Sequence, residues 1–155
     1  MAELADHYEA NSQHVLAAPL YLRAVTLMPA ANTDCHALTL MTNLSASLCQ
    51  QNPPVGSGIT REQLIEDAGK WAKKVLELDA NVKPPQRTPE CDEACLVATH
   101  NLAEMAEMLG HNSEAERRYL EARSLAKGLG VAEGVDRAQQ GLDRIAAKGT
   151  VSVKA

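Results

Sequence analysis

The chain has 155 residues, which is long enough for one domain with a hydrophobic core and too short for two ordinary ones. Ala and Leu dominate its apolar residues, Phe is absent, and only three Tyr and one Trp are aromatic, a composition that favours helices over strands. The formal charge of −5 and the lack of basic runs argue against binding to nucleic-acid phosphates, and no apolar stretch reaches the roughly 20 residues of a membrane span. We therefore expect an all-α domain.

Seven helices are predicted from the spacing of apolar residues and from the breaks between them. The third ends at the segment QNPPVGSG, because Pro and Gly cannot continue a helix there. Thr60, with Gln63 three residues later, has the pattern of a capping box, and Thr88-Pro89-Glu90 is typical of a helix start. The predicted helices cover residues 2–11, 14–28, 33–51, 60–79, 88–110, 112–127 and 132–147, and residues 148–155 are expected to form a flexible tail.

Small and aromatic residues recur at matching places in the first and last predicted hairpins. In the last hairpin they are Leu102, Ala103 and Ala106 before Gly110, then Ala115, Tyr119 and Ala122 after it. In the first hairpin they are Leu4, Ala5 and Tyr8, then Ala17, Tyr21 and Ala24, with Pro29 at the end and Ser12 at the turn. This pattern resembles the tetratricopeptide (TPR) repeat of about 34 residues, a pair of antiparallel helices. A middle copy with insertions is recognisable at Leu44, Ser45, Leu48, Ala68, Ala72 and Val75.

The resemblance implies a TPR-like α-solenoid in one domain, residues 1–147. Its three helical hairpins would cover about residues 1–29, 33–80 and 89–128, and residues 132–147 would form a capping helix. Small residues would let the two helices of a hairpin approach closely, while Leu102 and Tyr119 would fill the space between hairpins. Met1 would fall at the fourth position of its repeat, so we expect the chain to be a fragment of a longer protein.

TPR proteins generally bind a partner segment in a concave groove that is lined by the first helix of each hairpin. In this chain the expected groove is acidic and polar, and its residues would be Glu3, Asp6, Thr39, Asn43, Val97, His100, Asn101, Glu104, Glu107 and Met108. Some family members hold acidic chaperone tails with groove cations, but here Ala2, Asp6, Val97 and Asn101 stand at clamp positions, and only Asn43 matches. An acidic tail would therefore be repelled, and a basic or polar segment is the expected partner. Asn43 and Asn101 share a repeat position, where they could contact a partner backbone or form an interhelical hydrogen bond.

No catalytic or metal-binding motif is present in the sequence. Its five His residues form no HExxH pair, and neither a GxSxG motif nor a phosphate-binding loop occurs, so we expect no enzyme activity and no cofactor. Cys91 and Cys95 lie one helical turn apart, a poor geometry for a disulfide, and no second pair completes a zinc site. All four cysteines, Cys35, Cys49, Cys91 and Cys95, are accordingly expected as reduced thiols.

A narrower resemblance covers most of residues 7–130, including HVLAAPLYLRAVTLMP and TPECDEACLVATHNLAEMAEMLG. These segments are similar to a fungal group of TPR proteins that act as the adaptor subunit of the mitochondrial inner-membrane i-AAA protease. The resemblance implies a non-catalytic adaptor that brings substrates to the protease, and an oxidising compartment in which some cysteines could pair. Without it, a cytoplasmic location is expected.

Two other functions fit the sequence. One is a structural or oligomerisation module whose groove is filled by its own insertions, such as residues 50–60. The other is a redox or metal sensor built on Cys91 and Cys95.

Overall fold

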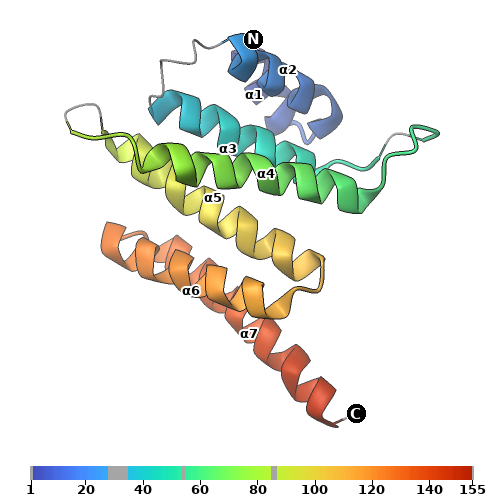
Figure 1. The fold of residues 1–155 in the computed structure, drawn as a ribbon, viewed down its shortest axis with the longest axis vertical. Coiled ribbons are helices and arrows are strands. Elements are labelled where there is room, and N and C mark those ends of the chain that lie inside the picture. The colour runs from blue at the N-terminus through green and yellow to red at the C-terminus, as the bar shows by residue number, and fades with distance from the viewer. Residues whose placement is uncertain (1, 28–34, 54, 85–86, 155) are drawn as a thin grey trace. The chain divides into compact units, whose positions relative to one another are not determined.

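The computed structural model describes residues 2–27, 35–53, 55–84 and 87–154, and within these ranges every regular element is a helix (Figure 1). This confirms the predicted all-α class. The helices are α1 (Ala2–Ala10), α2 (His14–Leu27), α3 (Cys35–Gln50), α4 (Arg61–Asp79), α5 (Pro89–Met108), α6 (Asn112–Leu129) and α7 (Ala132–Lys154). The last helix thus continues to Lys154, where a flexible tail was predicted from residue 148.

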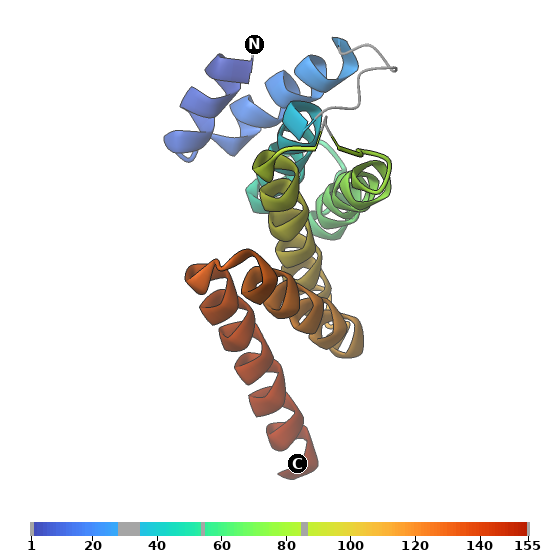
Figure 2. The same ribbon diagram turned by 90° about the vertical axis from the view of Figure 1, so that its left-hand side faces the viewer.

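The chain divides into two compact units, Met1–Ala98 and Thr99–Ala155, whereas one domain was predicted. In the first unit α2 packs on both α1 and α3, and α3 also packs on α4 (Figures 1 and 2). In the second unit α6 and α7 pack on each other and are joined by a short turn. The boundary falls within α5, so the two halves of this helix contribute to different units.

The helix ends follow from the residues that cap them. Thr60 accepts a hydrogen bond from the Gln63 backbone amide (3.1 Å), and the Gln63 side chain accepts one from the Thr60 amide (2.9 Å), which confirms the predicted capping box. In the first turn Ser12 has a φ of 58°, in the left-handed region that Gly110 occupies with a φ of 77°. Ser12 therefore adopts the conformation of the glycine that it replaces. Met1 and Pro29, both used in the repeat argument, lie outside the described residues.

Most of the small repeat residues are fully buried, as the resemblance implies. Tyr21 and Tyr119 are 1% and 0% exposed, and the other buried members are Ala5, Ala17, Leu44, Ser45, Ala68, Ala72, Val75, Leu102, Ala103, Ala106, Ala115 and Ala122. Tyr8, Ala24 and Leu48 are half-buried. Leu4 differs, since 48% of it is exposed, because α1 packs on α2 through Ala5 rather than through Leu4.

The two units share a three-helix pattern with a constant separation in sequence. Helices α1, α2 and α3 form the first copy. Their counterparts in the second copy are residues 100–108 of α5, helix α6 and helix α7, and each counterpart begins about 98 residues later in the chain. The turns match as well: the amide of Ser12 donates to the Glu9 carbonyl (2.9 Å), and the amide of Gly110 donates to the Glu107 carbonyl (3.1 Å). Tyr21 and Tyr119 are counterparts in this comparison. A residue in one copy can therefore be compared directly with its counterpart in the other.

Candidate partner-binding surfaces

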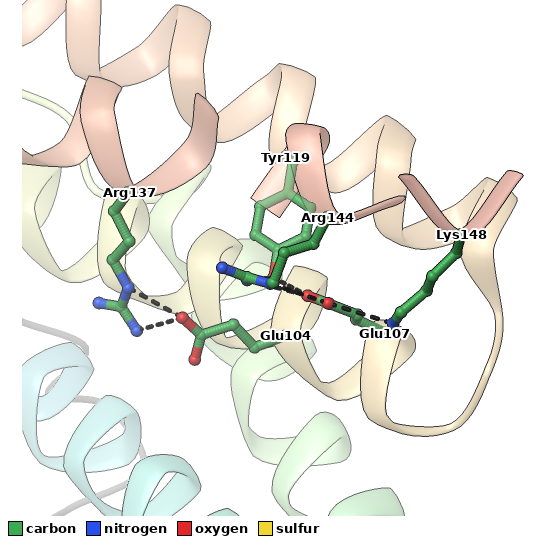
Figure 3. Close-up of polar contacts among 6 residues, drawn as sticks. All are labelled: Glu104, Glu107, Tyr119, Arg137, Arg144 and Lys148. Carbon is green, nitrogen blue, oxygen red and sulfur yellow. Dashed lines mark hydrogen bonds and ion pairs between the residues drawn. The ribbon is translucent and has the colours of Figure 1, made fainter. Parts of the chain in front are cut away.

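In the second unit, two acidic residues of α5 are paired with cations of α7. Arg137 donates to Glu104 Oε1 from Nε (2.9 Å) and Nη2 (2.6 Å). Arg144 donates to both carboxylate oxygens of Glu107, each at 3.0 Å, and Lys148 lies 3.3 Å from the same carboxylate. Figure 3 shows these three cationic side chains converging on the two glutamates. Neither carboxylate is left without a positive partner.

Tyr119 completes this cluster from α6. Its buried hydroxyl donates to Glu107 Oε1 (2.7 Å) and accepts from Arg144 Nη2 (3.1 Å) (Figure 3). The hydrogen bond from Arg144 is the largest effect on Glu107 and lowers its pKa to about 2, against the opposing effect of burial. Burial and the bond to Glu107 raise the pKa of Tyr119. The cluster thus holds a carboxylate that is ionised at neutral pH.

The predicted groove residues of the second unit are mostly unavailable to a partner. His100 and Asn101 are 2% and 7% exposed, and burial lowers the pKa of His100. Glu104 and Glu107 are engaged by α7, and only Met108, at 52%, is largely exposed. The predicted acidic surface is therefore covered here by the helix that was expected only to cap the stack.

The first unit contains a pocket of about 360 Å³ between α3 and the start of α5. It brings together three predicted groove residues, Thr39, Asn43 and Val97, and adds Thr42, Glu90, Glu93 and Ala94. Thr39 Oγ1 donates to Glu90 Oε1 (2.9 Å), and His36 lies 3.7 Å from the same oxygen. Glu90 and Glu93 were not predicted as site residues, although they lie one helical turn apart in the sequence. The pocket has a polar, acidic rim beside the apolar Ala94 and Val97.

The other predicted groove residues of this unit, Glu3 and Asp6, are exposed on α1. Asp6 accepts a hydrogen bond from the Tyr21 hydroxyl (2.5 Å), and burial followed by this bond raises the pKa of Tyr21. Glu9, which was not predicted, accepts from the Ser47 hydroxyl and lies 3.0 Å from His14 Nδ1. Within the part of the chain that the structure describes, no Lys or Arg forms an ion pair with Asp6, Glu9, Glu90 or Glu93.

The prediction of four reduced cysteines was wrong for two of them. Cys35 and Cys91 form a disulfide between α3 and α5, with their Cα atoms 4.6 Å apart, while Cys49 and Cys95 are outside any disulfide. Cys91 and Cys95 are close in sequence, whereas Cys35 and Cys91 are 56 residues apart and are brought together only by the packing of α3 and α5. Burial raises the pKa of Cys95 to about 11, so this thiol is not activated. Because Cys91 is in a disulfide, a metal site on Cys91 and Cys95 is not formed.

The chain is similar to a protein of Schizosaccharomyces pombe that carries the name TPR repeat-containing protein. The two are 33% identical over 111 residues, which is 72% of this chain and 31% of the yeast protein. The matched region is thus less than a third of that relative's length. No family model matches the chain, and no solved structure matches it significantly. Over the described residues, every helix is too short or too polar to cross a lipid bilayer.

The relative's name agrees with the buried Ala and Tyr pattern of the two matching hairpins. Together, the all-helical fold and this similarity support a TPR-like family for the chain.

Proposed function

We propose that the chain is a non-catalytic interaction module whose first unit binds a basic or polar segment of a partner protein. The observation that carries this proposal is the pocket between α3 and α5, which combines Glu90 and Glu93 with the apolar side chains of Ala94 and Val97. Carboxylates without a neighbouring Lys or Arg attract a cationic partner, and apolar side chains add contact area that excludes water. The similarity to a TPR-named protein supports the same class, because TPR arrays bind proteins on extended surfaces.

A self-filled groove is not favoured by the contacts of the first unit. Gln50, Gln51 and Asn52 border a different pocket, together with residues 12–16 of the first turn and α2. None of the described residues of the 50–60 insertion lines the pocket beside Glu90. Filling of this pocket by the insertion is therefore not supported.

The proposed adaptor role rests on the narrower sequence resemblance given above. In this role the pocket would hold a segment of a substrate, or of the protease itself, at the mitochondrial inner membrane. Copurification with the i-AAA protease from fungal mitochondria, compared between the normal chain and the pocket variant below, tests this role separately from binding itself.

Binding can be tested with one fluorescent 12-residue peptide made in a Lys/Arg-containing form and in an Asp/Glu-containing form. We expect the chain to bind the basic form, more weakly as salt rises, and to reject the acidic form. The Glu90→Gln, Glu93→Gln variant should lose binding. Glu62→Gln, Glu66→Gln is the matched control, since it removes the same charge from two exposed positions of α4. Equal binding by both variants, or of both peptides, would exclude the pocket as the site.

A further inference from the structure

The two three-helix copies carry the same acidic pair but differ in the cations around it. Asp6 and Glu9 are the counterparts of Glu104 and Glu107, again 98 residues apart. The three basic residues of α7 that contact this pair have neutral counterparts on α3: Thr39 for Arg137, Ala46 for Arg144 and Gln50 for Lys148. The first copy thus has the two carboxylates but lacks the basic side chains that pair with them in the second copy.

The second copy shows which chemistry the site suits. The guanidinium of Arg144 contacts both oxygens of Glu107 and the hydroxyl of Tyr119, with three distances between 3.0 and 3.1 Å (Figure 3). Arg137 also uses two nitrogens, both of which donate to Oε1 of Glu104. A planar guanidinium can make such paired contacts, whereas an ammonium group cannot. The acceptor set is therefore suited to arginine.

In the first copy the corresponding carboxylates are partly exposed and contact uncharged hydroxyl groups and His14, where the second copy has guanidinium groups. Asp6 is exposed, the Glu9 side chain is 25% exposed, and their contacts are the hydroxyls of Tyr21 and Ser47 and the ring of His14. Thr39 and Ala46 stand at the counterpart positions of the two arginines, so α3 supplies no guanidinium group to this site; Asn43 of α3 contacts the Tyr21 hydroxyl instead. Asn43 borders the pocket beside Glu90 and also contacts the Tyr21 hydroxyl, so the two acidic sites adjoin.

We propose that Asp6, Glu9 and the Tyr21 hydroxyl form an arginine-binding site, which a partner segment fills in the way that α7 fills the equivalent site in the second unit. This inference rests on the proposed function and specifies the side chain that the partner presents at the surface next to the pocket. The presence of two acidic residues would not by itself indicate an arginine-binding site. The main support comes from the second copy, in which carboxylates and a tyrosine hydroxyl at the same repeat positions bind guanidinium groups.

The probe is a fluorescent peptide with two arginines seven residues apart, the separation of Arg137 and Arg144, in an otherwise neutral sequence. A second peptide has lysine at both positions. Fluorescence anisotropy with the full chain should give an affinity for the arginine peptide about tenfold higher than for the lysine peptide, because only arginine makes the paired contacts. Equal affinities would overturn the proposal.

Two variants locate the site. Asp6→Asn, Glu9→Gln should lose the preference for arginine, while the Glu62→Gln, Glu66→Gln control keeps it. Thr39→Arg, Ala46→Arg places the α7 arginines on α3, where they should pair with Asp6 and Glu9 and exclude the peptide. Circular dichroism shows whether each variant is folded. The second variant adds ion pairs and removes none, so it still tests the site if the first variant does not fold. A preference for the arginine peptide that survives in a folded form of either variant would contradict the proposal.

The same peptide measurements distinguish the arginine site at Asp6 and Glu9 from the pocket at Glu90 and Glu93. Binding that depends on Glu90 and Glu93 but not on Asp6 and Glu9 would overturn the arginine site and leave the proposed function standing. A chain that binds none of the peptides would overturn both.

Discussion

At the scale of single residues, the contact between Gly141 and Tyr119 determines how closely α7 can approach α6. A Cβ atom placed on Gly141 would lie 2.4 Å from Cζ of the Tyr119 ring, far inside van der Waals contact. We expect Gly141→Ala to destabilise the protein by about 1–3 kcal/mol, the usual cost of overpacking. Gly128→Ala is the matched control in α6, where nothing lies within 4 Å of the added atom. It should be neutral or raise stability by up to about 1 kcal/mol. Urea unfolding followed by circular dichroism measures both, and equal effects would contradict the close contact.

Glu107 should make stability depend on pH in the acid range. Its pKa is lowered from 4.5 to about 2 in the folded state, mainly by Arg144, so its ionised form favours folding. This contribution is complete above pH 4.5 and is lost as the pH falls toward 2. The stability difference between the normal chain and Glu107→Gln should therefore shrink over that range. A difference that stays constant from neutral pH to pH 3 would show that the ion pair does not form.

Residue patterns predicted the buried positions better than they predicted the site. Most alanines and tyrosines of the two matching hairpins are buried, since close helix packing requires small residues, and that requirement is visible in the sequence. The sequence did not show whether Glu104 and Glu107 are accessible to a partner, because their accessibility depends on which face of α7 meets α5. The spacing of Arg137, Arg144 and Lys148 did carry a signal, since helical periodicity puts them on one face.

At the scale of helices, the disulfide joins α3 to the start of α5 next to the candidate pocket. Replacing Cys35 and Cys91 with Ser should destabilise the first unit by about 4 kcal/mol in the chain-entropy model, given the 56 residues that separate them. Reducing agent should lower the urea midpoint of the normal chain and leave that of the variant unchanged. Unfolding curves of the normal chain that coincide with and without reductant would show that the disulfide does not contribute.

Helix positions were largely predictable, because caps and breaks act locally. The capping box at Thr60 and the break after Gln50 are local signals, and both are present in the structure. The extension of α7 to Lys154 was missed, since Gly149 and the β-branched residues after it are weak helix formers. The disulfide was missed for a different reason, because pairing between helices depends on tertiary structure.

At the scale of the whole molecule, the chain contains two copies of one three-helix pattern that differ in charge. In the second copy the acidic pair forms ion pairs with α7, and in the first copy Asp6 is exposed and Glu9 partly exposed, with no Lys or Arg partner among the described residues. The overall helical class and the repeat were predictable from the sequence. The difference between the copies required the contacts of each unit, because the same acidic pattern is present in both.

Chemical-shift mapping by NMR, with isotope-labelled full chain and the two-arginine peptide, would show directly which helices contact the bound peptide. We expect the shift changes to concentrate in the first unit, on α1, on the Thr39–Asn43 stretch of α3 and on residues 90–97 of α5. They should be absent from α6 and α7. Shifts centred on Glu104 and Glu107, or no shifts at saturating peptide, would contradict the assignment of partner binding to the first unit.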